Sequence, residues 1–303
     1  MVDLKILLLG KDGQVGRELQ RSLATARLVA IDRPELDFER LDDLRELVRR
    51  ESPDVIVNAA AYTAVDRAES EPELCRRINA EAVAAVAEEA RSLGGLFVHY
   101  STDYVFDGTK TGVFDGTKEG WYEETDEPKP LGVYGLTKLE GEQAAATAGR
   151  YLVFRTSWVY AAHGHNFIRT MLRLAQERET LDVIDDQWGA PTGAALLADV
   201  TALAIDRCRR PETAIPSGLY HLVARGETTW CRFARFVIAE ARRRGLALKA
   251  GPEAVRAIPT SAYPTAAKRP ANSRLSTAKL RAALGIDLPP WEEGVAAVVA
   301  ALV

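Results

Sequence analysis

The chain has 303 residues, of which 47% are hydrophobic, so it can bury a sizeable core and exceeds one minimal domain. Its formal net charge of −4 gives no general attraction to nucleic acid, and it contains no uncharged apolar stretch long enough to span a membrane. The N-terminus lacks the layout of a cleavable signal, and the three cysteines are far apart. We therefore expect a cytoplasmic protein with reduced thiols and no nucleic-acid or membrane partner.

The first residues have the pattern of a dinucleotide-binding unit. Residues 4–9 are apolar apart from Lys5, as in a strand buried on both faces, and residues 17–23 continue as a helix. Glycines between a strand and a helix let the backbone approach a pyrophosphate, although the spacing here is GxxGxxG and a purely structural turn is the alternative. The expected cofactor contacts in this segment are Gly10, Gly13, Gln14, Val15 and Gly16.

The end of the second predicted strand, residues 28–31, bears on the choice of cofactor. Asp32 follows Gly10 at close to the ~20-residue interval of an acid that binds the adenosine ribose. Arg33 beside it could instead neutralise a 2′-phosphate. The first signal points to NADH and the second to NADPH, so the sequence leaves the choice open. We lean to NADPH, with NADH also accepted.

Strands and helices then alternate. We expect helices at residues 41–50 and 72–93, and strands at 55–57, 96–100 and 151–155. This alternation predicts an α/β fold with a doubly wound parallel sheet of the Rossmann type, whose ligands bind at the C-terminal edge of the strands. The third strand is followed by small residues that permit close approach of a flat ring system, and the expected contacts are Ala60, Ala61, Tyr62 and Thr63.

The strict alternation weakens after residue 156. We expect helices at 167–176, 194–208 and 230–244, strands at 181–184 and 219–222, and irregular chain at 186–192 and 259–270. The predicted organisation is a Rossmann NAD(P)-binding domain over residues 1–156. A smaller mixed α/β substrate-binding lobe would occupy residues 157–303, with some of its segments able to return to the first domain.

The strongest chemical signal is a tyrosine and a lysine four residues apart. Tyr134 and Lys138 begin a predicted helix and share one of its faces, while Thr102 follows the fourth strand. An ammonium about 5 Å from a phenolate contributes about 3 kcal/mol at an effective dielectric of ~20. We therefore predict that Thr102 bonds a substrate carbonyl, Tyr134 protonates it and Lys138 stabilises the phenolate. The alternative is an ordinary pair on a surface helix.

Two other features carry less weight. His163 and His165 suggest a metal, but no nearby cysteine or carboxylate cluster completes a site, so we predict none. Residues 105–120 contain a tandem octapeptide, which we interpret as a duplication in a mobile surface loop. A lid over the active site is the alternative.

Across nearly its full length the chain resembles the extended short-chain dehydrogenases/reductases, and among them the dTDP-4-dehydrorhamnose reductase family. The segments that carry the resemblance are residues 10–16, 58–66, 101–108, 134–142, 155–160, 186–192 and 269–275. The family implies reduction of the C4 keto group of dTDP-6-deoxy-L-lyxo-4-hexulose by NAD(P)H, giving dTDP-L-rhamnose. The chain departs from the family at His165, where a basic residue is usual, and in its second octapeptide.

The resemblance also implies roles for individual residues. Asp103 joins Thr102 at the sugar and completes a catalytic set with Tyr134 and Lys138. Further cofactor contacts are Asp37 and Phe38, and further substrate contacts are Trp158, Asn166, Arg269 and Asn272. The expected partner is a nucleotide sugar, and a homodimer is compatible with the sequence. Two alternatives are a sugar-nucleotide epimerase and a non-catalytic relative such as a methionine adenosyltransferase regulatory subunit. Retention of the catalytic set favours an enzyme.

Overall fold

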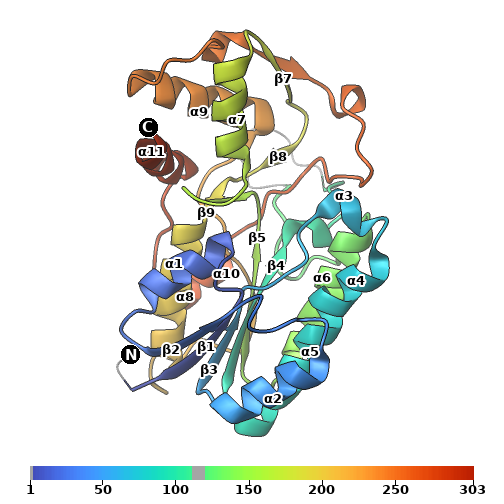
Figure 1. Cartoon of the computed structure of the whole chain (residues 1–303), viewed down its shortest axis with the longest axis vertical. Helices are drawn as coiled ribbons and strands as arrows, with labels where there is room; N and C mark the ends of the chain where they lie inside the picture. Colours follow the sequence, from blue (N-terminus) through green and yellow to red (C-terminus); the bar gives the residue numbers. More distant parts are fainter. Residues whose placement is uncertain (1–2, 111–119) are drawn as a thin grey trace.

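A six-stranded parallel sheet forms one half of the molecule (Figure 1). The computed structural model describes residues 3–110 and 120–303. The sheet order is β10-β5-β4-β3-β1-β2, and the strands are β1 (Lys5–Leu9), β2 (Arg27–Ile31), β3 (Val55–Asn58), β4 (Leu96–Thr102), β5 (Tyr151–Thr156) and β10 (Gly218–His221). The predicted doubly wound α/β fold is confirmed. Most of the second octapeptide lies outside the described residues, so the loop prediction is untested.

Alternating side chains on the strands create a core on each face of this sheet. In β1, Ile6 and Leu8 pack toward one helical layer, whereas Leu7 and Leu9 pack toward the other. The first layer contains α1 (Gln14–Ser22), α8 (Ala194–Cys208) and α10 (Ala278–Leu284). The second contains α2 (Leu41–Glu51), α5 (Ala82–Leu93) and α6 (Val133–Ala146) (Figure 1). The near-continuous apolar character of the strands follows from burial on both sides.

The helix predicted over residues 72–93 is confirmed in its bounds, but it is not α-helical throughout. The chain forms α4 (Pro72–Arg76), a π-helical turn η1 (Arg77–Glu81) and then α5. A π turn holds an extra residue, which a 3.6-residue hydrophobic period does not reveal. This turn holds the buried Asn79 against the backbone of Tyr62, whose N–H donates to Asn79 Oδ1 at 2.8 Å and whose carbonyl accepts from Nδ2 at 3.1 Å. The irregular turn therefore positions a segment that was expected to bind cofactor.

The second half of the chain builds an upper lobe around its own core. Helices α7 (Phe167–Glu177), α9 (Trp230–Arg243) and α11 (Trp291–Leu302) contribute to this core, as do β7 (Leu181–Ile184) and β12 (Val255–Ile258), which pair in parallel. The smaller elements are α3 (Val65–Ala68), η2 (Asp103–Val105), β6 (Val159–Tyr160), β8 (Trp188–Gly189), β9 (Thr192–Gly193), β11 (Thr228–Thr229), η3 (Pro252–Ala254) and η4 (Thr260–Ala262). The short strands β8 and β9 lie in a stretch that was expected to be irregular. Three elements from the later part of the chain, β10, α8 and α10, pack with the first sheet. The division into two domains at residue 156 stays a prediction. Among the described residues, no helix is both long and apolar enough to cross a membrane.

A buried ion pair ties α6 to the sheet behind the strand ends. Arg155 on β5 donates to Glu142 on α6 through Nε at 2.8 Å and through Nη2 at 2.7 Å, with side-chain exposures of 2% and 8%. Ser101 on β4 also donates to the Glu142 carboxylate. The pair therefore joins three elements next to Thr102 and Lys138. A bidentate, desolvated arrangement of this kind is costly to break from one side.

We predict that Glu142→Gln lowers the free energy of unfolding by about 3–5 kcal/mol, because it leaves Arg155 buried without its anion. Glu140→Gln is the matched control on the same helix, since Glu140 pairs with Arg76 at the surface. Its expected cost is below about 1 kcal/mol. Urea unfolding at neutral pH measures both. Equal losses in the two variants would show that burial does not strengthen the Arg155–Glu142 pair.

Candidate active site

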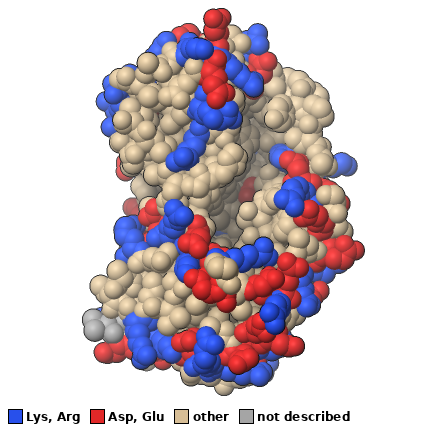
Figure 2. All heavy atoms as spheres, in the orientation of Figure 1, with Lys and Arg blue, Asp and Glu red and all other residues tan. Residues whose placement is uncertain are grey.

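A cleft of about 830 Å³ opens between the sheet and the upper lobe. Figure 2 shows the molecule hollowed between its two halves. Strands β1, β3 and β4 all end at this cleft, because the carboxyl ends of parallel strands share one edge of a sheet. The residues that follow them, Gly10, Ala59 and Asp103, line it.

The glycine loop is shaped by two close approaches and one open position. Gly10 has φ +85°, and a Cβ there would lie 2.5 Å from the Ala60 nitrogen. A Cβ on Gly16 would lie 1.9 Å from the Gly10 carbonyl oxygen, so neither position accepts a side chain. A Cβ on Gly13 would come only within 3.5 Å of the Gly10 oxygen, and Gly13 lines the cleft. The backbone here leaves room for a phosphate group at the N-terminus of α1.

Most of the predicted cofactor residues gather along this part of the cleft. Those lining it are Gly10, Gly13, Gln14, Val15, Asp32, Arg33, Phe38, Ala60, Ala61, Tyr62 and Thr63. Gly16 lies behind the loop and Asp37 beside the cleft, and neither lines it. The predicted set is thus brought together by the fold, while the contacts of each residue with a cofactor stay predictions.

Charges of both signs meet where the ribose was expected. Asp32 accepts from the backbone N–H of Asp12 at 3.0 Å and from that of Arg33 at 2.8 Å. The Arg33 guanidinium is exposed and lies 3.3 Å from carboxylate oxygens of both Asp37 and Glu39. Arg33 therefore has carboxylate partners that a phosphate could replace.

Thr102 and Asp103 lie at the end of β4, next to the cleft. The Thr102 hydroxyl donates to Asp103 Oδ1 at 3.0 Å and accepts from the backbone N–H of Tyr104 at 3.2 Å. Burial raises the pKa of Asp103 to about 6, and interactions with the Ser273 and Thr102 side chains only partly oppose this shift. A part of the Asp103 population therefore keeps its proton near neutral pH.

Tyr134 and Lys138 reach the same cleft from the first turns of α6. Burial raises the pKa of Tyr134 above its ordinary value, and interaction with the Thr102 hydroxyl only partly opposes this shift. The Lys138 ammonium donates to the Tyr100 carbonyl at 2.6 Å, and burial lowers the pKa of Lys138 to about 8. Tyr134 thus holds a proton that it can give away, beside a lysine that titrates near neutral pH.

His99 is a neighbour of Lys138 that the sequence analysis missed. Its Nε2 lies 3.3 Å from Lys138 Nζ, and its Nδ1 lies 3.3 Å from Asn58 Nδ2. Asn58 Oδ1 accepts from the N–H of Ala60 at 3.1 Å, so the amide N–H₂ of Asn58 faces His99. Nδ1 must then accept, which leaves the ring proton on Nε2, facing Lys138. A polar residue in the apolar β4 was the available signal.

The opposite wall of the cleft is aromatic. Trp158 has φ +48°, and its ring stacks on Trp230 with centroids 3.7 Å apart. A Cβ on Gly189 would lie 2.7 Å from Trp158 Cε2, so only glycine fits behind the indole. Trp230 also lines the cleft and was missed, because the sequence analysis placed it only at the start of a predicted helix. Trp158 serves both the cleft wall and the upper core.

Three predicted substrate residues do not line the cleft. Arg269 forms a two-pronged ion pair with Asp66, at 3.2 and 2.8 Å. Asn272 is buried, and its amide donates to the carbonyls of Lys110 and Gly120. The polar atoms of Asn166 also have protein partners. Direct substrate contact by these three residues stays a prediction.

His163 and His165 lie near the glycine loop, where His165 lines the cleft. Within residues 3–110 and 120–303, no group of three or more histidine, cysteine or acidic side chains is arranged to hold a metal ion.

The comparisons with known proteins agree with this geometry. A family model described as the RmlD substrate binding domain matches residues 4–303. The dTDP-4-dehydrorhamnose reductase of Salmonella typhimurium is 54% identical over 299 residues, which cover 96% of each chain. A crystal structure of a dTDP-4-dehydrorhamnose reductase from Clostridium acetobutylicum superposes with a TM-score of 0.88, at 32% identity and 99% coverage of both chains. Another, from Bacillus anthracis in complex with NADP, has a TM-score of 0.85 at 31% identity, again with 99% coverage of both. The resemblance inferred from the motifs is confirmed, and the chain belongs to the dTDP-4-dehydrorhamnose reductase family.

Proposed function

We propose that this chain reduces the C4 keto group of dTDP-6-deoxy-L-lyxo-4-hexulose to give dTDP-L-rhamnose. NADPH is the preferred hydride donor and NADH is also accepted. The observation that carries the proposal is the meeting of Thr102, Asp103, Tyr134 and Lys138 in one cleft with the glycine loop, in a chain of this family. A non-catalytic relative would not need this complete set.

The residues along the lower wall of the cleft fit a dinucleotide. Gly13 gives the backbone room for a pyrophosphate at the start of α1, and Asp32 offers carboxylate oxygens to a ribose. Ala60 and Ala61 leave space for a flat ring near Lys138. When bound, NADPH supplies the hydride that reaches the carbonyl carbon.

The protein's part in the reaction is to hold the carbonyl and deliver a proton. The Thr102 hydroxyl orients the carbonyl oxygen, and Tyr134 gives its phenolic proton to that oxygen as negative charge develops there. The charged form of Lys138 stabilises the phenolate that remains. The raised pKa of Tyr134 keeps its proton in place until the substrate carbonyl can accept it.

The aromatic wall suits the sugar of the substrate. Trp158 presents a large surface, and its stack on Trp230 holds the indole in one orientation. Arg269, which Asp66 orients, is proposed to act at the nucleotide end by the family resemblance. We also propose that the protein works in the cytoplasm, where the free thiols of Cys75, Cys208 and Cys231 would stay reduced. A homodimer stays a prediction.

An assay of cofactor oxidation tests the function directly. The keto-sugar nucleotide should drive stoichiometric oxidation of NADPH, and more slowly of NADH, with dTDP-L-rhamnose as the product. A sugar-nucleotide epimerase would instead interconvert sugars without net cofactor consumption. Absence of net oxidation with this substrate would refute the proposal.

We predict that Tyr134→Phe lowers kcat by about 10²–10⁴-fold while the Kd for NADPH changes little, because the variant removes the acid and keeps the ring. Tyr104→Phe is the control, since its ring packs edge-on against Tyr134 with centroids 5.6 Å apart. Turnover of the control should stay within a few-fold of wild type. Wild-type kcat in Tyr134→Phe would rule out the assigned proton donor.

We predict that kcat/KM for NADPH falls as pH rises above about 8, because Lys138 with a pKa of about 8 then loses its charge. The ratio kcat/KM is the suitable measure, since it reports ionisations of the free enzyme. Lys138→Met should be far less active and should show no such decline between pH 7 and 9. If the decline persists in Lys138→Met, another group causes it.

We predict that Arg33→Ala raises KM for NADPH by about 10–100-fold and changes KM for NADH little, the range expected for loss of a charged hydrogen bond of about 1.5–3 kcal/mol. Arg40→Ala is the matched control, because Arg40 pairs with Asp43 nearby but does not line the cleft. Equal effects of Arg33→Ala on both cofactors would show that Arg33 does not recognise the 2′-phosphate.

A further inference from the structure

The side chain of Asn166 organises the segment that leads into α7. Its Oδ1 accepts from the backbone N–H of Arg169 at 3.2 Å, which caps the helix. Its Nδ2 donates to the carbonyls of Ala161 at 2.8 Å and His163 at 3.2 Å. One buried amide therefore fixes both the segment at residues 161–163 and the first turn of α7.

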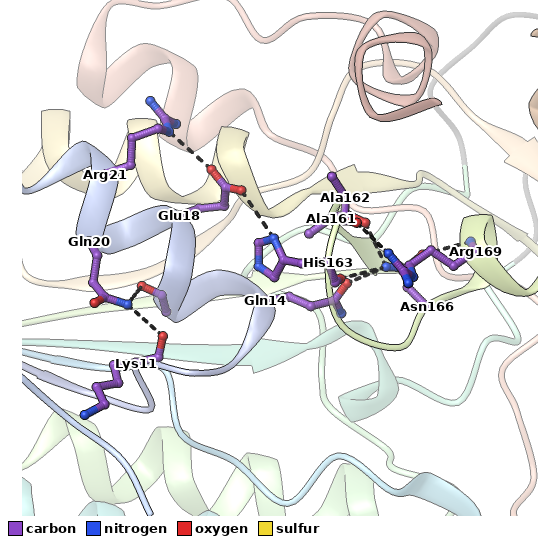
Figure 3. A network of polar contacts seen from close by, with 11 residues as sticks. Lys11, Gln14, Glu18, Gln20, Arg21, Ala161, Ala162, His163, Asn166 and Arg169 are labelled. Carbon is purple, nitrogen blue, oxygen red and sulfur yellow. Dashed lines mark hydrogen bonds and ion pairs between the residues drawn. The ribbon is translucent and has the colours of Figure 1, made fainter. Parts of the chain in front are cut away.

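The same amide also reaches the cofactor-binding half of the molecule. Asn166 Nδ2 donates to Gln14 Oε1 at 2.8 Å, across 152 residues of sequence, as Figure 3 shows. Gln14 is the first residue of α1 and directly follows Gly13 of the glycine loop. A Cβ on Gly164 would lie 3.1 Å from Gln14 Cγ, so the two segments touch closely. One turn along α1, Glu18 lies 3.9 Å from His163 Nδ1.

A short chain of contacts continues from Asn166 to the sugar side of the cleft. Phe167, the next residue, packs against Trp230 with ring centroids 4.7 Å apart. Trp230 in turn stacks on Trp158 at 3.7 Å, and its Nε1 donates to Gln187 at 3.2 Å. The cofactor loop and the aromatic wall are thus linked through packed side chains.

We propose that Gln14 and Asn166 form a positioning contact through which cofactor binding at the glycine loop fixes the first turn of α7 and the aromatic wall beside it. The proposal rests on the proposed function for the identity of the two ligands. A pyrophosphate held at the start of α1 restricts the motion of Gln14, and the hydrogen bond passes this restriction to Asn166. A nucleotide sugar that then binds against an ordered wall loses less conformational freedom, so the two ligands favour each other.

Two substitutions separate this role from simple helix capping. Gln14→Met removes the Oε1 acceptor at nearly constant length and leaves Asn166 its cap and both carbonyl contacts. Asn166→Ser keeps a residue that caps helices well, but it is too short to reach Gln14. Arg169→Met is the matched control, because Arg169 donates to the Ala162 carbonyl in the same segment without crossing to α1.

The direct test is hydrogen exchange of the peptide spanning residues 163–171, measured with saturating NADPH and without it. In the wild-type protein and in Arg169→Met, NADPH should slow exchange by about tenfold, a typical size for coupling between sites. In Gln14→Met and Asn166→Ser the slowing should fall below about twofold. No sugar is present, so this result does not depend on the identity of the substrate.

The functional readout is the Kd for NADPH with and without saturating dTDP-L-rhamnose. We expect about tenfold tighter NADPH binding in the presence of the sugar nucleotide, lost in Gln14→Met and Asn166→Ser, with no further loss in the double variant. In both single variants, the KM for NADPH and the KM for the sugar nucleotide should rise. The proposal would be overturned if NADPH did not slow exchange in the wild-type protein, or if it still slowed exchange in Gln14→Met. Failure of the turnover assay alone would instead count against the proposed function.

Discussion

The burial of Lys138 is the constraint on which the site depends. An ammonium removed from water is costly, and here it has the Tyr100 carbonyl as an acceptor but faces a ring nitrogen of His99. Burial lowers the pKa of Lys138 to about 8, although the charge of Glu142 opposes this shift. A lysine at the surface would stay fully charged near neutrality, and one buried without an acceptor would lose its proton. The position of α6 against β4, which fixes these distances, is therefore part of the chemistry.

That position is held by contacts that do not face the substrate. Glu142 and Arg155 join α6 to β5, and Ser101 adds β4 to the same pair. On the other side of α6, a Cβ on Gly141 would lie 2.2 Å from the Asn79 carbonyl, so the helix packs directly on the π-helical turn. Through Asn79, the π-helical turn also holds Tyr62 at the cleft. Helix α6 and the expected cofactor contacts share one packed support.

Much of this arrangement could be predicted from the sequence, because local patterns determine it. Apolar runs predicted the strands. The residues that follow these runs, among them Gly10, Ala60 and Thr102, predicted the edge of the sheet where the strand ends meet. The contacts that were missed depend on distant parts of the chain. The sequence around His99 does not show that α6 places Lys138 beside it. Likewise, the sequence around Trp230 does not show that Trp158 stacks on it. The π turn inside the helix at 72–93 was missed because the composition there is helical throughout, whereas the turn packs against α6, a distant part of the chain.

The ribose end shows why two opposing sequence signals can both be correct. Both oxygens of Asp32 accept backbone N–H groups, so its carboxylate is fixed but retains lone pairs for ribose hydroxyls. Arg33 is exposed and shared between Asp37 and Glu39, at 3.3 Å from each. Exposed ion pairs of this kind are worth about 0–1 kcal/mol, so Arg33 can exchange a carboxylate for a 2′-phosphate at little cost. When the cofactor has no 2′-phosphate, the Arg33 guanidinium can stay paired with Asp37 and Glu39, and the oxygens of Asp32 can still accept from ribose hydroxyls. Under the proposed function, the same local charges would accept NADPH and NADH, with the balance set by how well Arg33 reaches the phosphate.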